Sequence, residues 1–459
     1  MTNLSTASSA ASSSPGALPR RRQAYAVLCV LFLFQTLNFF DKVVFGLSAV
    51  PMMKELSINP RTFGLIGSSF YLLFPVSGIL VGLFVIGRVQ VRWLLVILAT
   101  IWSISQISVF FSSSVVALMI CRVMLGLGEG PGLPSAFHAS YDWFPSERRG
   151  IPGAVVLQGI SFGLLVGSPA LTYVIMRYGW HFAFLLCGLL GAAWIGIWLL
   201  VGDEGPYAHA NHAAKEIGRD EPILAFRIPA KELWLNPTVL GVMIMSTAAY
   251  WVTGMAATWL PSYLQLGLGY KQVETGWILS AIYIFQSPLL LAGGKVTELL
   301  LRRGWTRRMC FGNGAAIVLV VCAAALQLAT LIGGVPRLVL IAIAFAAPSL
   351  TTIVGPMTLG AIAPPAQRGS LIVVIYSANT FSALFSNAVV GWIVQMAGHD
   401  LAAGFAHAMT FTAGILLIGG LSAFALIFPD RTLSRFANLE SSQASGKTLI
   451  ANPDPVATL

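Results

Sequence analysis

The segment from Cys121 to Gly150 reads CRVMLGLGEGPGLPSAFHASYDWFPSERRG and places Arg122, Glu129 and His138 in or beside a long apolar run. Charged groups at membrane depth are costly and usually face a protein interior or a watery cavity, so each is a candidate for function. Arg122 and Glu129 are seven positions apart, which puts them on nearly the same face of a helix, about 10 Å apart along its axis. A basic and an acidic group on one helix face are typical of a pathway lining.

The first apolar run carries a second ionisable pair, Asp41 and Lys42. Burial raises the pKa of a carboxyl group, and a nearby cation lowers it. A helix movement that separates a buried carboxyl from Lys42 or Arg122 would switch its proton affinity, which is what proton coupling requires. We expect Asp41 and Glu129 to carry coupling protons, Arg122 to modulate them, and His138 to be a candidate relay. The alternative is a static network of salt bridges that only fixes helix packing.

The composition defines the class of protein that must position these groups. Hydrophobic residues make up 56% of the 459 residues and charged residues 10%, with a mean hydropathy of +0.80. Soluble domains have roughly 25% charged residues. The apolar residues form continuous runs of about 20, the length of a membrane-spanning helix, instead of the alternation of a β-barrel. The fold class that follows is an all-α integral membrane protein.

We expect twelve spans in two groups of six, 24–201 and 237–428, with a polar cytoplasmic linker at 202–236. Residues 1–23 and 429–459 are polar tails, for which we expect no regular structure. The spans of the first half are expected at about 24–50, 62–86, 93–111, 115–140, 151–174 and 181–201. Those of the second half are expected at about 238–264, 273–297, 309–333, 336–362, 369–395 and 402–428.

Basic residues predict the orientation. Of the 27 Lys and Arg residues, five fall in loops expected outside and three within spans. The other 19 fall on the side of the two termini, and this asymmetry indicates that both termini are cytoplasmic. The net charge of +10 comes from these short turns, so we expect no nucleic-acid partner. The five cysteines are scattered through apolar segments, which predicts neither a disulfide framework nor a zinc site.

The two halves also repeat. Pro145 is followed by Arg149 and Gly150, and Pro364 is followed at the same spacing by Arg368 and Gly369, an offset of 219 residues. Two pseudo-symmetric six-helix halves in parallel orientation are the architecture of the major facilitator fold, with its substrate site at mid-membrane between them.

The span region, roughly residues 24–428, resembles the major facilitator superfamily and within it the anion:cation symporter family. The first-span motif of that family is matched by Asn38, Asp41 and Lys42, and the eleventh-span Asn-Thr by Asn379 and Thr380. The fourth-span motif is the most specific part and is matched by Arg122, Glu129, Pro131, Pro134, Trp143, Phe144, Pro145, Glu147 and Arg148. The resemblance, which also includes Tyr71 in the second span, implies uptake of a small organic anion together with protons.

On this resemblance we expect Lys42 to hold the carboxylate of the substrate, assisted by Tyr71, Gln158 and Asn379. Lys42 stands where the family has Arg, and a Lys offers a point charge in place of a planar fork, which leaves the precise substrate open. Other polar side chains in spans are candidates for lining the same cavity: Ser161, Tyr250, Thr258, Gln286, Tyr376 and Asn387.

Two basic turns resemble the gating loops of the superfamily. The first contains Gly87, Arg88 and Arg92 but lacks the usual acidic residue. The second keeps it, in the set Gly294, Glu298, Arg302, Arg303 and Gly304. We therefore expect the first gating turn to be weakened or differently paired.

Other function classes find little support in the chain. There is no GxxxxGK[ST] loop for ATP, no metal-ligand cluster, and no convincing nucleophile and base pair for an enzyme. We expect no cofactor and a monomer in a bacterial inner membrane. The leading hypothesis is proton-driven uptake of a sugar acid, dicarboxylate or aromatic carboxylate. A proton-coupled efflux or exchange antiporter and a non-transporting anion sensor are the alternatives.

Overall fold

The structure is a computed structural model that describes residues 17–86, 88–145, 148–208 and 227–451. In that part of the chain, twelve helical segments are long and apolar enough to cross a membrane. Their apolar length explains the helices, because a chain in lipid must satisfy every backbone group within its own segment. The predicted number of spans and the all-α fold class are confirmed.

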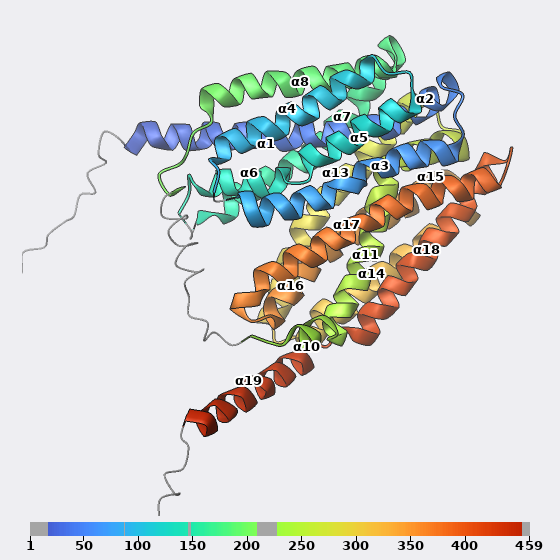
Figure 1. The fold of residues 1–459 in the computed structure, drawn as a ribbon. Coiled ribbons are helices and arrows are strands. Elements are labelled where there is room, and N and C mark those ends of the chain that lie inside the picture. The colour runs from blue at the N-terminus through green and yellow to red at the C-terminus, as the bar shows by residue number, and fades with distance from the viewer. Residues whose placement is uncertain (1–16, 87, 146–147, 209–226, 452–459) are drawn as a thin grey trace, which may run out of the picture.

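The first six spans form one half of the bundle (Figure 1). Several spans are built from more than one element, and the fourth is broken at Gly130 and Pro131, because a proline ring removes a helical hydrogen bond. The elements of this half are α1 (Ala17–Leu47), α2 (Ala49–Glu55), α3 (Pro60–Leu80), η1 (Val81–Val85), α4 (Val91–Phe110), α5 (Val115–Glu129), α6 (Gly132–Tyr141), α7 (Gly150–Tyr178) and α8 (Trp180–Val201).

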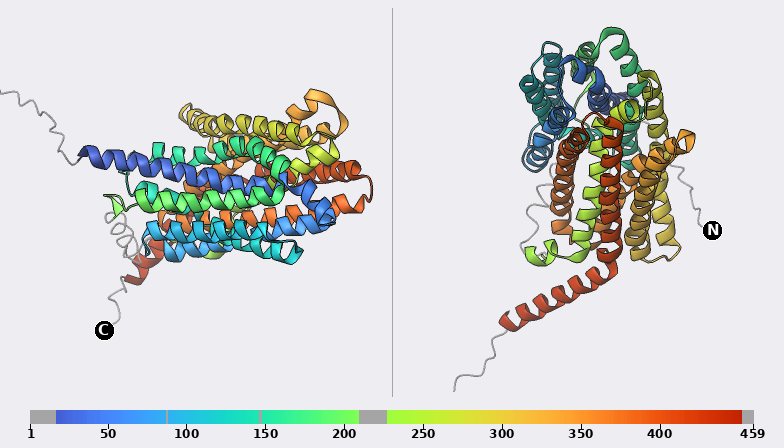
Figure 2. Two further views of the ribbon diagram at one scale, coloured as in Figure 1. Left: turned by 90° about the horizontal axis from the view of Figure 1, so that it is seen from above. Right: turned by 90° about the vertical axis from the view of Figure 1, so that its right-hand side faces the viewer.

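The second six spans form the other half. Its elements are α11 (Pro237–Thr258), α12 (Leu260–Ser262), η3 (Tyr263–Gly267), α13 (Gln272–Arg302), η4 (Arg308–Asn313), α14 (Gly314–Leu331), α15 (Gly334–Ala346), η5 (Ala347–Leu350), α16 (Thr351–Ile362), α17 (Pro365–Met396) and α18 (Leu401–Leu426). The short α10 (Ala230–Trp234) precedes it, and α19 (Pro429–Ala451) follows it and extends obliquely from the bundle (Figure 2).

Two segments differ from the sequence-based expectation. Helix α1 begins at Ala17, within the tail assigned to 1–23. The region after Pro429, expected to lack regular structure, forms α19. Its first turns are held by tertiary contacts, since Thr432 and Phe436 are buried against the second half. Residues 1–16, 209–226 and 452–459 of the expected tails and linker lie outside the described residues.

We call the end of the bundle at which α1 begins and α18 ends the terminus end, and the opposite end the far end. The halves meet toward the far end, where Gln272 donates to the carbonyl of Leu47 at 3.2 Å. Ser68 likewise donates to Leu384 at 2.7 Å across the α3–α17 contact. Toward the terminus end the two sets of helices diverge (Figure 1). Among described residues, the cross-half hydrogen bond nearest to that end joins Ser287 to Gln158 at 3.0 Å.

Close packing of α3 against α5 positions the charged residues of the first half. A Cβ at Gly126 would lie 2.0 Å from the carbonyl oxygen of Phe70, and one at Gly130 would lie 2.1 Å from that of Phe74. Only glycine permits this approach, which brings α5 and its ionisable side chains against the core of the half.

Candidate functional site

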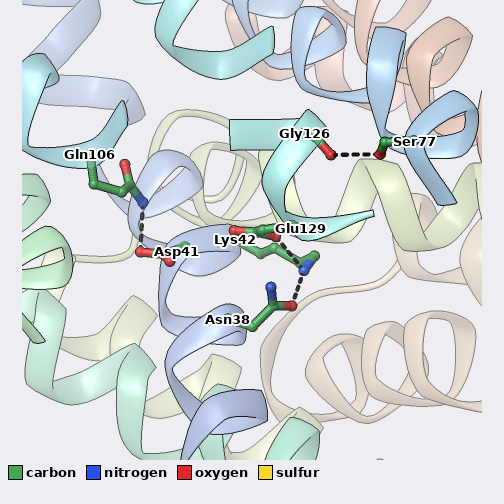
Figure 3. A network of polar contacts seen from close by, with 7 residues as sticks. All are labelled: Asn38, Asp41, Lys42, Ser77, Gln106, Gly126 and Glu129. Atoms are coloured by element: carbon green, nitrogen blue, oxygen red, sulfur yellow. Dashed lines mark hydrogen bonds and ion pairs between the residues drawn. The ribbon is translucent and has the colours of Figure 1, made fainter. Parts of the chain in front are cut away.

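The centre of the first half contains a buried ion pair between two helices. The Nζ atom of Lys42 on α1 lies 2.6 Å from Oε2 of Glu129 on α5 (Figure 3). The same Nζ donates to Oδ1 of Asn38, one turn back on α1, at 2.5 Å. The Glu129 side chain has no exposed area and that of Lys42 is 13% exposed. Removing two charges from water carries a large desolvation cost, so a pair at this depth is a candidate for function and not only for stability.

The ion-pair partner of Glu129 is Lys42, one of the two cations that the sequence offered for this carboxyl. Arg122, expected to modulate Glu129, forms no ion pair with it among the described residues but lies within electrostatic range of it. The Arg122 guanidinium lies over the rings of Phe45 and Phe70, at 4.2 and 4.9 Å from their centroids. Its Nε and Nη1 atoms are buried and have no hydrogen-bond partner among the described residues. The physical reason is geometric: two helical turns separate Arg122 from Glu129 along α5, whereas α1 approaches Glu129 from the side.

Asp41 faces away from the ion pair. Its Oδ1 atom accepts a hydrogen bond of 2.6 Å from Nε2 of Gln106 on α4, and both side chains are about 1% exposed (Figure 3). Cys187 of α8 is another close neighbour of this carboxyl. Gln106 was not among the residues expected at the site, although an amide side chain within an apolar span is itself a signal of a buried polar partner.

The expected substrate-binding residues come from helices at the junction of the two halves. Tyr71 of α3 packs edge-on against Phe70, with 4.8 Å between ring centroids. Gln158 of α7 accepts the hydrogen bond from Ser287, and Asn379 of α17 accepts one of 3.0 Å from Thr247 of α11. The Nδ2 atom of Asn379 is buried without a protein partner in the described part of the chain. No hydrogen bond between described residues joins Gln158 or Asn379 directly to Lys42.

Tyrosines of the second half extend this polar junction. Tyr250 of α11 and Tyr376 of α17 pack edge-on at 5.7 Å between centroids, and the Tyr376 hydroxyl donates to the carbonyl of Thr352. Tyr250 and Tyr283 of α13 both lie within electrostatic range of Tyr71 in the first half. The sequence analysis named Tyr250 and Tyr376 but not Tyr283, which lies in an apolar stretch of α13.

The residues of the gating turns lie at the terminus end. Arg302 pairs with Glu298 at 2.6 Å within α13, and both side chains are largely exposed. Arg303 caps the same helix and is exposed. In the first half Arg88 donates to the carbonyl of Phe84 at 3.2 Å, and Arg92 donates to Leu199 at 2.7 Å. The first turn therefore binds backbone carbonyls in place of an acidic side chain.

His138, the candidate relay, is partly buried on α6, beyond the break at Pro131. Gly87 and Glu147 lie outside the described residues.

In the part of the chain that the structure describes, twelve apolar helices in two halves, with buried charges in the first half and polar side chains at the junction, are the architecture of a multi-pass membrane protein. The sequence profile of the Major Facilitator Superfamily matches residues 31–355. The chain belongs to this superfamily, and it is a transporter and not an enzyme.

Curated relatives extend over most of the chain. The hexuronate transporter of Bacillus subtilis (strain 168) is 24% identical over 410 residues, which cover 87% of this chain and 92% of the relative. The D-galactonate transporter of Escherichia coli O6:H1 is 24% identical over 436 residues, 90% of this chain and 97% of the relative.

Solved structures share the fold. A bacterial homologue of the human lysosomal transporter Spinster, in an inward-facing and unoccupied conformation, matches with a TM-score of 0.74 at 17% identity. The match covers 90% of this chain and 98% of that one. The D-xylose–proton symporter matches with a TM-score of 0.69 at 14% identity, over 89% of this chain and 99% of that one.

Proposed function

We propose that this protein takes up a small organic anion by proton symport, with the two halves alternating in access to the two sides of the membrane. The observation that carries the proposal is the buried ion pair of Lys42 and Glu129. In this pair the carboxylate of Glu129 binds the cation that an anionic substrate would need. The relatives that are hexuronate and D-galactonate transporters support a sugar acid as the substrate class.

The ion pair links substrate to proton by competition. While Glu129 is ionised it neutralises Lys42, so a substrate carboxylate must compete with Glu129 for that cation. A proton on Glu129 neutralises the competitor and frees Lys42 for the substrate carboxylate. One proton and one anion then enter together, and the total buried charge stays constant.

The remaining residues have roles that follow from their surroundings. Arg122 is a second buried cation with unpartnered nitrogens, so it provides a planar fork for a carboxylate near the Lys42 site. Tyr71, Gln158 and Asn379 lie on helices at the junction of the halves, and their polar atoms suit the hydroxyl groups of a sugar acid. Asp41, hydrogen-bonded to Gln106, is a second proton carrier. His138 remains a proposed relay.

We also propose an orientation of the protein in the membrane and a conformational state for this structure. The terminus end carries most of the basic residues, and we assign it to the cytoplasm by the positive-inside rule. The halves are joined toward the far end and diverge at the terminus end, so this arrangement corresponds to an inward-facing state. The likeness to an inward-facing solved structure supports that assignment. We propose a monomer in a bacterial inner membrane, with the halves at 24–201 and 237–428.

The test is uptake of radiolabelled carboxylates into proteoliposomes, with and without an inward proton gradient. The panel includes hexuronates, galactonate, dicarboxylates and aromatic carboxylates, with a neutral sugar as control. We expect accumulation of a sugar acid that collapses when an uncoupler is added. Exchange without accumulation would instead indicate an antiporter, and binding without movement a sensor.

A further inference from the structure

Two arginines from separate segments converge on one aromatic ring at the terminus end of the second half. The guanidinium carbon of Arg308, the first residue of η4, lies 4.2 Å from the ring centroid of Phe428. That of Arg431, in the first turn of α19, lies 4.6 Å from the same centroid. The two positive charges are therefore less than about 9 Å apart, close enough to repel each other unless an anion lies between or beside them.

Among the described residues, neither arginine forms an ion pair. The Nε atom of Arg308 is buried and has no hydrogen-bond partner in that part of the chain. Asp430, next to Arg431, is exposed and forms no ion pair with a described residue. By contrast, Arg435, one turn further along α19, pairs with Glu232 of α10. The protein thus supplies a carboxylate to one arginine of α19 and none to the pair at Phe428.

Exposed apolar residues flank Arg308 and Phe428 in the sequence. Trp305 and Met309, just before and within η4, are 49% and 44% exposed, and Phe424 near the end of α18 is 54% exposed. A Cβ at Gly312 would lie 2.9 Å from the carbonyl oxygen of Ile427, so η4 and the end of α18 are in direct contact. Figure 1 shows α19 leaving the end of α18 at an angle. Arginines at the ends of two spans, beside an exposed tryptophan, are typical of the membrane–water interface.

We infer that Arg308 and Arg431, with Phe428 between them, form a binding site for the phosphate of an anionic phospholipid. We call these three residues the arginine elbow. Two guanidinium groups give a phosphate several charge-assisted hydrogen bonds. The exposed side chains of Met309 and Phe424 provide an apolar surface for the acyl chains, which favours a lipid over a free phosphate. A bound headgroup bridges η4 and α19 and so attaches the C-terminal helix to the ninth span.

The experiment measures lipid binding to the full-length protein in detergent by native mass spectrometry. Phosphatidylglycerol and cardiolipin are compared with phosphatidylcholine, and inorganic phosphate is added as a competitor. The test variant is Arg308→Ala/Arg431→Ala. The matched control is Arg435→Ala, which removes the same charge from the same helix at a position that already has a carboxylate partner. Arg308→Lys/Arg431→Lys retains charge if the alanine variant fails to fold.

We expect wild type and the Arg435→Ala control to bind the anionic lipids preferentially. The double alanine variant should bind them about 30-fold more weakly, since each arginine near an anionic surface contributes about a five-fold gain in affinity. The lysine variant keeps both charges but loses the planar guanidinium groups, so it should fold and bind the anionic lipids more weakly than wild type. Three results would each overturn the assignment. The wild type could bind phosphatidylcholine as tightly as the anionic lipids, or Arg435→Ala could lose as much binding as the double alanine variant. Millimolar inorganic phosphate could also displace the bound lipid.

Discussion

Asp41 and Lys42 are consecutive residues of α1, yet their side chains bind different helices of the bundle. Asp41 accepts a hydrogen bond from Gln106 of α4, whereas Lys42 pairs with Glu129 of α5. Successive residues of a helix point about 100° apart, so one turn of α1 makes polar contacts with two different helices. Asp41 nevertheless lies within electrostatic range of Glu129 and Lys42, so a change of charge at one contact is also felt at the other.

Removing Lys42 should destabilise the protein as well as stop transport. Lys42→Ala leaves Glu129 fully buried and unpaired, which costs about 3–5 kcal/mol in buried pairs. Lys42→Ala/Glu129→Gln removes both charges and should recover most of that stability but no uptake. Thermal unfolding in detergent and proteoliposome uptake measure the two effects. A Lys42→Ala variant that transports at the wild-type rate would remove this residue from the substrate site.

Glu129→Gln should reduce the pH dependence of substrate binding. If a proton must occupy Glu129 before the anion binds, wild-type affinity falls as pH rises, by up to tenfold per pH unit for each coupled proton. The glutamine variant should lose one unit from the slope of log Kd against pH. Isothermal titration calorimetry with the substrate found by uptake measures this slope between pH 5 and 8. An unchanged slope would show that Glu129 is not a coupling site.

Substitutions of Asp41 and of Gln106 should have different effects, the first on proton coupling and the second on stability. Asp41→Asn keeps the size of the side chain and removes one of the two proposed proton carriers while Glu129 remains, so uptake should respond less steeply to the proton gradient than in wild type. Gln106→Leu removes the hydrogen bond to a buried carboxyl, which costs about 1–3 kcal/mol of stability, but should leave gradient-driven uptake in place. Full proton-dependent uptake by Asp41→Asn would assign Asp41 a structural role.

Gly64 should control closure of the far end. A Cβ at this position on α3 would lie 2.5 Å from the carbonyl oxygen of Asn387 on α17, across the junction of the halves. Gly64→Ala should cost the closed far end about 1–3 kcal/mol. Spin labels at the exposed positions Arg61 and His399 should then report longer distances. Gly82→Ala, where a Cβ meets nothing within 4 Å, is the control and should leave the distances unchanged.

The orientation can be measured with cysteine labelling. Single cysteines at His399, on the far end, and at Arg302, on the terminus end, are introduced with the exposed Cys29 replaced by serine. A membrane-impermeant maleimide should label position 399 in intact cells and position 302 only after lysis. The reverse pattern would place the termini outside.

Local features of the sequence were sufficient for the spans and for the buried charges Asp41, Arg122 and Glu129, but not for Asp142, which is also buried although it lies near the end of its span. The length of an apolar run limits a span directly, and the expected third span at 93–111 corresponds to the observed Val91–Phe110. The proximity of Glu298 and Arg302 also follows from the sequence, because residues four apart on a helix are neighbours whatever the tertiary structure.

Only the tertiary structure decided which charges meet. Glu129 pairs with Lys42, 87 positions away, and not with Arg122 on its own helix. That choice depends on how closely α3 and α5 approach through Gly126 and Gly130, and on the rotation of α1, neither of which a linear pattern specifies. The helix α19 shows the same limit, since its mixed sequence gains order from Phe436 and Thr432 packing against the second half. Pairing across helices is set by packing, and packing is a property of the whole bundle.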